Sequence, residues 1–197
     1  MKYNMCMILE VVKYPSSVLT QKSQKAVFND ELKTLVQNML DTINSFKDPP
    51  AAGLSAIQVD IPLRVLIARD FVSDQIGNNE VLRNNGVTTI DGVTRDNAFI
   101  DYILINPKFV SLSKEKELDW EGCLSFPDLY GKVWRSKKVK LKYQNTQGEE
   151  QRLTTSNFLA RVIQHEIDHL AGITFNTKVV GKMYKGDELE KGTEIVD

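Results

Sequence analysis

The chain contains only two histidines, His165 and His169, and they stand four positions apart. At about 100° per residue along an α-helix, the two side chains leave the same face, about 40° apart and one turn from each other. This spacing suits two imidazoles that bind one metal ion. Glu166 follows the first histidine, where such motifs place a carboxylate that takes a proton from a metal-bound water. The pair therefore predicts a helix with a hydrolytic metal site.

The residues around the histidines have the pattern of a helix over positions 156–171. A capping side chain stands at its first or second position, and Gly172 follows its last residue. Val162 and Phe158 fall on the same face as the two histidines, one and two turns earlier. We therefore expect the histidines to point into the core, where few waters compete for the metal.

Two histidines do not complete a catalytic site, because three protein ligands are usual. One candidate for the third ligand is Cys123, although a lone cysteine is more often a small core residue. Gly122 beside it allows close backbone approach, and Pro127 is expected to end any regular element. The other candidates are Glu188 and Glu190, about 20 residues downstream as in many metallopeptidases. They lie in a charged segment bracketed by glycines, which is a poor rigid platform.

The composition bounds the kind of protein. The 197 residues suit one domain, and the formal net charge of −1 gives no support for nucleic acid or a membrane surface as the main partner. No apolar run approaches the roughly 20 residues of a membrane span. The N-terminus has no signal-peptide pattern, and two cysteines do not form a disulfide framework. We expect a reducing, cytoplasmic compartment.

Hydrophobic periodicity predicts several further elements. An amphipathic helix is expected over residues 29–47, and buried strands over 64–68 and 102–112. Alternating residues from 138 to 143, a turn at 145–148 and a partner strand through Leu153 predict a hairpin. Its lysines favour a solvated strand face over an RNA contact. Residues 73–97 are a long polar excursion, with a hairpin suggested around 87–90, and the chain after Val180 reads as a loosely ordered polar tail.

Three segments in order resemble the peptide deformylase family. Residues 53–58 are a glycine-led stretch that ends in glutamine, residues 121–125 read Glu-Gly-Cys-Leu-Ser, and residues 164–169 read Gln-His-Glu-Ile-Asp-His. The resemblance extends over about residues 8–180. It implies an α+β fold in which antiparallel β-sheets surround a central helix that carries the HExxH metal motif. We accordingly expect one catalytic domain over residues 1–180 and a polar C-terminal tail over 181–197.

The resemblance implies the metal ligands and the general base. Cys123, His165 and His169 would bind one divalent ion, and Glu166 would take a proton from the metal-bound water that attacks the formyl carbon. A Cys/His/His set accepts zinc, nickel, cobalt or ferrous iron, so metal identity does not follow from the donors. The family resemblance favours iron as the native metal, with zinc a common replacement.

The resemblance also implies the substrate and its contacts. The substrate would be the N-formylmethionine terminus of nascent polypeptides, and the products formate and a free amine. The Gln58 side chain and the Leu124 backbone N–H would donate to the formyl oxygen and stabilise an oxyanion. Gly53 would bind substrate backbone by strand addition, and Val162 would contribute to the substrate site. The chain lacks the long C-terminal helix of many bacterial members, so a transient ribosome contact is left open.

Some positions depart from the family pattern or surround the expected ligands. Ala51 stands where many members have glycine, and Ser55 stands where they have alanine, so its hydroxyl is expected to alter the substrate wall. Asp168 adjoins His169, and we expect it to pair with Arg135 and thereby lock the helix against the Cys123 segment. Glu121 is expected to orient one of the ligand rings.

Two other functions compete with the deformylase hypothesis. The first is a zinc peptidase that uses a glutamate of the tail as its third ligand. The second is a structural metal site without activity, in which a fourth protein ligand closes the coordination shell; Cys6 is the other thiol available for that role. Bacterial, organellar and viral origins all fit the sequence.

Overall fold

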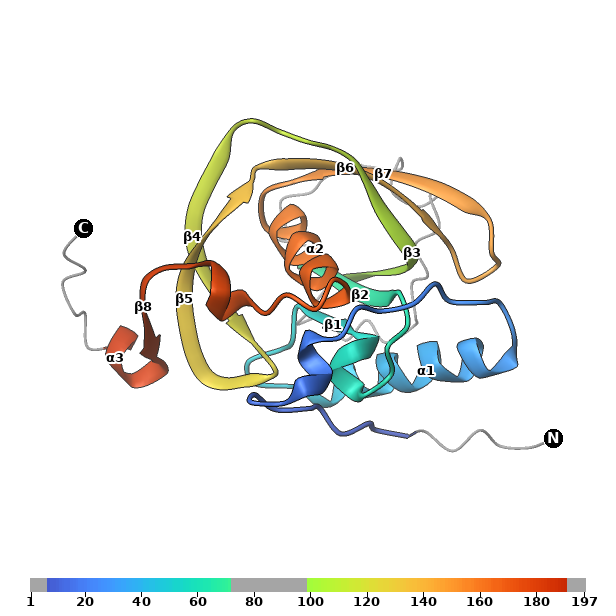
Figure 1. Cartoon of the computed structure of the whole chain (residues 1–197), viewed down its shortest axis with the longest axis horizontal. Helices are drawn as coiled ribbons and strands as arrows, with labels where there is room; N and C mark the ends of the chain where they lie inside the picture. The colour runs from blue at the N-terminus through green and yellow to red at the C-terminus, as the bar shows by residue number, and fades with distance from the viewer. Residues whose placement is uncertain (1–6, 72–98, 191–197) are drawn as a thin grey trace.

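The computed structural model describes residues 7–71 and 99–190, and it has an α+β fold with two antiparallel β-sheets (Figure 1). The larger sheet has the strand order β1-β2-β3-β6-β7, and the smaller sheet has the order β4-β5-β8. The strands are β1 (Gly53–Ser55), β2 (Val65–Phe71), β3 (Phe99–Leu112), β4 (Lys116–Cys123), β5 (Phe126–Ser136), β6 (Lys138–Gln144), β7 (Glu150–Ser156) and β8 (Val179–Lys185). The helices are α1 (Asp30–Ser45), α2 (Asn157–Leu170) and α3 (Gly186–Glu190), with 3-10 turns η1 (Ser17–Thr20), η2 (Ala56–Val59) and η4 (Phe175–Lys178).

Helix α1 confirms the amphipathic helix predicted over residues 29–47. Asn29 caps it, because its side-chain oxygen accepts a hydrogen bond from the Leu32 N–H at 2.9 Å. The face with Met39 and Ile43 is fully buried against β1 and β2. The helix ends at Ser45, before the two prolines that cannot continue it.

Strands β6 and β7 form the predicted hairpin. Leu141 pairs with Leu153 in the register of the two strands. The turn is closed by the Asn145 side-chain oxygen, which accepts from the backbone N–H groups of Gln147 and Glu149. Gly148 follows with a positive φ of 85°, a conformation that glycine adopts without strain.

Helix α2 lies between the two sheets, with β1 and β2 on one side and β5 on the other (Figure 1). Leu159, Ile163 and Leu170 are buried with residues of β2, β3 and β6. The helix ends before Gly172, which has a φ of +74° and packs so closely on Thr20 that a Cβ there would lie 2.4 Å from its carbonyl oxygen. The predicted helix over 156–171 is thus confirmed to within one residue at each end.

Two sequence-based expectations about secondary structure were wrong. The chain after Val180 is not an irregular tail in its first part, because β8 continues through Lys185 as an edge strand paired with β5 and α3 follows it. Pro127 does not end a regular element but is the second residue of β5. The apolar residues of β8 stand in adjacent pairs, Val179 with Val180 and Met183 with Tyr184, so the alternation that marks a strand in a sequence is missing.

Other expectations lie outside the described residues. These are the polar excursion at 73–97 with its suggested hairpin, the last residues of the tail, and Cys6 as a fourth metal ligand. Within the described part of the chain, none of the helices has the length and apolar character needed to span a bilayer.

Candidate metal centre and active site

Helix α2 and the end of strand β4 bring three ligand side chains together. His165 and His169 project from α2, and Cys123 is the last residue of β4. One ligand atom from each of the three lies within 4.8 Å of the other two, and Cys123 Sγ is 3.2 Å from His169 Nε2. The three residues that the sequence indicated as metal ligands therefore converge.

The histidine rings are oriented so that they can coordinate a metal. The His165 Nδ1–H donates to the Glu121 carboxylate at 2.9 Å, which leaves Nε2 for a metal. His169 is fully buried, and its Nδ1 has no hydrogen-bond partner among the described residues. A thiol sulfur and two imidazole nitrogens in a closed cluster form a donor set that fits zinc or ferrous iron.

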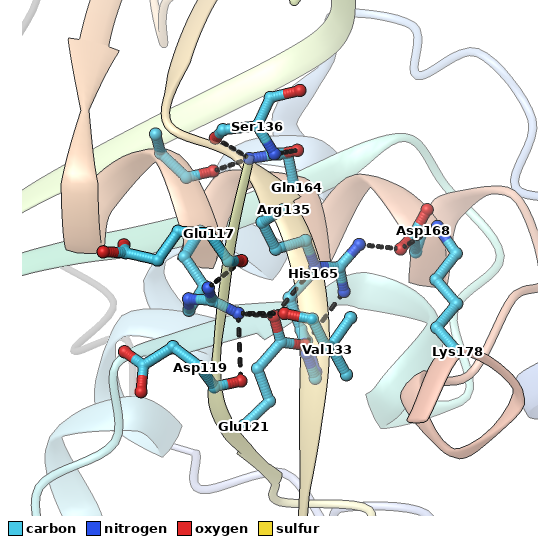
Figure 2. Close-up of polar contacts among 12 residues, drawn as sticks. Glu117, Asp119, Glu121, Val133, Arg135, Ser136, Gln164, His165, Asp168 and Lys178 are labelled. Carbon is cyan, nitrogen blue, oxygen red and sulfur yellow. Dashed lines mark hydrogen bonds and ion pairs between the residues drawn. The ribbon is translucent and has the colours of Figure 1, made fainter. Parts of the chain in front are cut away.

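Glu121 is the centre of a buried network of charges behind His165 (Figure 2). Its carboxylate accepts from Arg135 Nε at 2.8 Å and Arg135 Nη2 at 2.9 Å, a bidentate pair. It also accepts from Arg161 Nη1 at 2.9 Å. All of its lone pairs are therefore engaged, so the carboxylate can hold the ring of His165 in one orientation, as the sequence analysis expected.

Arg135 also connects this network to helix α2. Its Nη1 donates to the carboxylate of Asp168, which also accepts from Lys178 Nζ at 2.6 Å (Figure 2). The predicted pair between Asp168 and Arg135 is thus confirmed. Because Arg135 lies in β5 and Asp168 in α2, the pair links the smaller sheet to the helix that carries the histidines.

Arg161 is a member of this network that the sequence analysis missed. It lies one turn before His165 on α2 and is buried. Its guanidinium donates to the carbonyl oxygens of Glu117 and Val133, each at 2.9 Å, in addition to the Glu121 carboxylate. The sequence did contain a signal for this contact, because the arginine lies one turn before the first histidine on the buried side of an amphipathic helix. A buried arginine needs a charged or polar partner inside the fold.

Burial and neighbouring charges set the protonation of the two histidines. Burial and the nearby His165 hold the pKa of His169 well below its usual value, so this imidazole stays neutral and can donate a lone pair. Burial also disfavours a charge on His165, but hydrogen bonds with Cys123 and Glu121 outweigh it and raise its pKa well above the usual value. A proton and a divalent ion therefore compete for the ring of His165.

Glu166 lies next to the ligands in a nearly closed environment. Its side chain is buried, and Oε2 has no hydrogen-bond partner among the described residues. Burial raises the pKa of Glu166 to about 7, against the opposing effects of His165 and the Ser55 hydroxyl. Gly53 is close to this carboxylate, since a Cβ at position 53 would lie 2.4 Å from Glu166 Oε1. A larger residue at position 53 would therefore force the Glu166 carboxylate to shift.

Gln58 faces the cluster from the 3-10 turn η2. Its side chain is almost fully buried, with Nε2 at 3.5 Å from Cys123 Sγ and at 3.3 Å from Ser125 Oγ. Its Oε1 accepts from both the backbone N–H and the hydroxyl of Ser55, each at 2.9 Å. The hydroxyl of Ser55 thus contacts Gln58. Ser55 is not among the residues that line the cleft, so the expectation that it alters the substrate wall was wrong.

A cleft of about 390 Å³ opens onto the cluster. Aromatic side chains line part of its wall, and an apolar cleft with a few convergent polar groups is typical of a small-molecule or peptide site. The cleft is bordered by the four residues expected to contact substrate, which are Gly53, Gln58, Leu124 and Val162. Cys123, His165 and Glu166 also line it.

Two other residues behave differently from expectation or were missed. Phe158 is 47% exposed, so it does not share the buried position of Val162, but it also lines the cleft. Lys13 lines the cleft, and its Nζ donates to the Leu124 carbonyl oxygen at 2.8 Å. A lysine 111 positions away in the chain carries no local signal of such a contact.

Glu188 does not join the metal cluster, and the side chain of Glu190 lies outside the described part of the chain. Glu188 lies in α3, where its carboxylate accepts from the Lys185 backbone N–H at 2.7 Å. The cluster that the described residues form consists of one cysteine and two histidines. This geometry argues against a zinc peptidase with Glu188 as its third ligand.

Comparisons with known proteins agree with this site. The family described as polypeptide deformylase matches residues 8–183. A peptide deformylase from Natranaerobius thermophilus is 39% identical over 159 residues, which cover 80% of this chain and 83% of that protein. A peptide deformylase from Wolinella succinogenes is 35% identical over 186 residues, which cover 93% of this chain and 94% of the relative.

Solved structures show the same fold. The crystal structure of a class I type b peptide deformylase from Acinetobacter baumannii with bound Met-Ala-Ser superposes with a TM-score of 0.71 and 29% identity. The superposition covers 89% of this chain and all of the other chain. The matched proteins are named peptide deformylases, which are enzymes, and the Cys-His-His cluster of this chain is a possible metal site. This chain belongs to the polypeptide deformylase family.

Proposed function

We propose that this protein removes the formyl group from the N-terminal formylmethionine of nascent polypeptides and releases formate and a free amino terminus. The observation that carries the proposal is the convergence of Cys123, His165 and His169 with Glu166 and Gln58 at one cleft. Membership of the deformylase family supports the reaction type. The bound Met-Ala-Ser in the relative from Acinetobacter baumannii is a peptide that begins with methionine, like the expected product.

Cys123, His165 and His169 would hold one divalent ion, with α2 as the central helix that carries the HExxH motif. When bound, the ion lowers the pKa of a coordinated water and polarises the formyl carbonyl. Ferrous iron is the proposed native metal, and zinc, nickel and cobalt also suit this donor set. Glu121 would keep the His165 ring in the orientation that coordination needs.

Glu166 acts as the general base of the proposed reaction. Its Oε atoms accept a proton from the attacking water, and the same carboxyl then returns that proton to the leaving amine. A pKa of about 7 suits both steps near neutral pH, because the group can then hold and release the proton. The role explains why a carboxylate whose Oε2 has no partner in the described part of the chain is retained in a buried position.

Gln58 and Leu124 stabilise the charge that develops on the formyl oxygen. Gln58 Nε2 is directed toward the cluster and donates a hydrogen bond to that oxygen, and the Leu124 N–H donates a second. Lys13 supports the second donor, because its bond to the Leu124 carbonyl oxygen holds the turn between β4 and β5. Both donors would be in place before the reaction begins.

The peptide part of the substrate binds along β1. This strand is at the edge of the larger sheet, so Gly53 can pair its backbone with the incoming peptide by strand addition. Val162 forms part of the wall of the same cleft and would contact the substrate. The proposed partners are therefore N-formylmethionyl nascent chains. A cytoplasmic or equivalent translating compartment, with a transient approach to the ribosome, follows from the origin of such chains.

The test combines metal analysis with an assay of formate release. Protein purified without oxygen should contain about one divalent ion per chain and release formate from formyl-Met-Ala. Acetyl-Met-Ala should react far more slowly, because the extra methyl group must fit beside Gly53 in the cleft. Tight metal binding without formate release would refute the proposal and favour a structural metal site.

A further inference from the structure

We infer that the Ser55 hydroxyl is a positioning group that holds the Gln58 side-chain amide with its NH₂ group toward the reacting centre. The inference rests on the proposed role of Gln58 as the donor to the formyl oxygen. It assigns a task to a residue that does not line the cleft itself.

Ser55 holds the acceptor end of the Gln58 amide. It is the last residue of β1 and directly precedes the turn η2 that carries Gln58. Its backbone N–H and its hydroxyl both donate to Gln58 Oε1, each at 2.9 Å. Ser55 is fully buried and Gln58 is 1% exposed, so no solvent can replace either donor.

The donor end of the same amide is held only weakly. Gln58 Nε2 lies 3.3 Å from Ser125 Oγ, which is longer than the usual hydrogen bond from nitrogen to oxygen. It also lies 3.5 Å from Cys123 Sγ, and sulfur is a weak acceptor. The amide is therefore anchored through its oxygen and open through its nitrogen. A substrate oxygen in the cleft can displace these weak contacts at little cost.

The two donors of Ser55 also exclude the flipped amide. Rotation by 180° would bring the Gln58 NH₂ group against the Ser55 N–H, so two donors would face each other. It would direct the oxygen Oε1 toward the sulfur of Cys123, where a formyl oxygen would meet an acceptor. The Ser55 backbone N–H by itself disfavours the flipped amide. The Ser55 hydroxyl disfavours it further, because the hydroxyl would have to turn its proton away and accept a hydrogen bond from the NH₂ group.

Ser55 has a second neighbour that the test must separate from Gln58. The hydroxyl also lies beside the carboxylate of Glu166, and its single proton can be donated either to Gln58 Oε1 or to that carboxylate. An effect of Ser55 through Glu166 would not depend on Gln58, whereas a positioning effect on the amide would vanish without it. This difference decides the design of the experiment.

The experiment is a double-mutant cycle of Ser55→Ala and Gln58→Ala with formyl-Met-Ala at matched metal content. Gln58→Ala should lower kcat by a factor of about 10² to 10³, as expected for loss of an oxyanion donor. Ser55→Ala should lower kcat about 3- to 10-fold and change KM less than about twofold, because one neutral hydrogen bond is lost. In the Gln58→Ala background, Ser55→Ala should have no further effect.

The second measurement does not depend on turnover. Protein with ¹⁵N-labelled glutamine shows the side-chain NH₂ signals by NMR, and Gln58→Ala assigns the pair that belongs to Gln58. Ser55→Ala should shift and broaden that pair. Ser136→Ala is the matched control, because its buried hydroxyl donates to the Ser113 carbonyl oxygen and has no contact with Gln58. The control should leave both kcat and the Gln58 signals unchanged.

Several results would overturn the inference. A Gln58 NH₂ pair that Ser55→Ala leaves unchanged would show that the hydroxyl does not hold the amide, whether or not formate is released. Equal kcat for Ser55→Ala and the parent, with Gln58→Ala impaired, would refute the role in turnover. A loss that persists in the Gln58→Ala background would assign the effect to Glu166. Failure of the proposed function itself is distinguishable, because the parent would then release no formate.

Discussion

Glu121→Gln should destabilise the protein and weaken its metal site together. The substitution keeps the shape of the side chain but removes a charge that receives hydrogen bonds from Arg135, Arg161 and His165 at 2.8–2.9 Å. All four side chains are buried, so two guanidinium groups would lose their main counter-ion without access to water. Removal of one partner from a buried ion pair costs about 3–5 kcal/mol. We expect a loss of this size in the free energy of unfolding.

The loss of metal affinity follows from the hydrogen bond to the ligand ring. In one orientation an amide at position 121 places its NH₂ group against His165 Nδ1 and Arg135 Nη2, and in the other it places that group against Arg135 Nε and Arg161 Nη1. The first orientation loses the hydrogen bond that holds the His165 ring, and the second keeps that bond only without the negative charge that strengthens it. Loss of such an orienting group typically weakens metal binding by about 10- to 100-fold. Urea unfolding of the metal-free protein measures the first effect, and competition with a chelator for zinc measures the second.

Asp101→Asn is the matched control. Asp101 forms a buried bidentate pair with Arg69, at 2.7 and 2.9 Å, between strands β2 and β3. Asp101→Asn should also lower the free energy of unfolding. It should leave the zinc affinity unchanged, because neither Asp101 nor Arg69 contacts a metal ligand. Stability within about 1 kcal/mol of the parent and unchanged zinc affinity in Glu121→Gln would refute the reasoning.

The same variant has a signature in the pH dependence of stability. Burial alone would raise the pKa of Glu121, but the hydrogen bonds from Arg135 and His165 outweigh it and hold the pKa well below its usual value. The stabilisation by Glu121 is therefore complete above the unfolded-state pKa of about 4.3 and is lost as the pH falls below it. The difference in stability between parent and Glu121→Gln should thus shrink in acid. A difference that stays constant from pH 6 to pH 3 would contradict this account.

Three further substitutions test the site directly. Cys123→Ser and His169→Ala should each abolish stoichiometric metal binding, because two remaining ligands hold a divalent ion poorly; unchanged metal content by elemental analysis would exclude the three-ligand assignment. Glu166→Gln should keep the metal but lower formate release by a factor on the order of 10² or more, and equal rates at matched metal content would remove Glu166 as the base. Gly53→Ala should lower kcat/KM with the fold retained by circular dichroism, because the new Cβ would lie 2.4 Å from Glu166 Oε1; a fully active variant would show that the carboxylate can shift freely.

Local patterns in the sequence predicted the features that depend on local geometry. The spacing of His165 and His169 placed both rings on one face of a helix, because the periodicity of the α-helix does not depend on its surroundings. Asn29 predicted the start of α1 for the same kind of reason, since a cap bonds the backbone three positions later. The hairpin of β6 and β7 followed from the turn at residues 145–148 and from side chains that alternate between two faces.

The partners of these local features were decided by the tertiary structure. Cys123 reaches His169 across 46 positions only because β4 ends beside α2, and Gln58 reaches Cys123 across 65. Residue type made Cys123 one of three candidate third ligands, and only the resemblance to a family selected it and indicated Gln58. Arg161 was not recognised, because periodicity marks a buried face without naming the acceptors that it meets. Edge strand β8 was missed because it pairs with β5 through backbone hydrogen bonds, and these form whatever the order of polar and apolar side chains. Helix and turn geometry are set within a few residues, whereas a buried charge or donor is stable only where the packed chain supplies its partner.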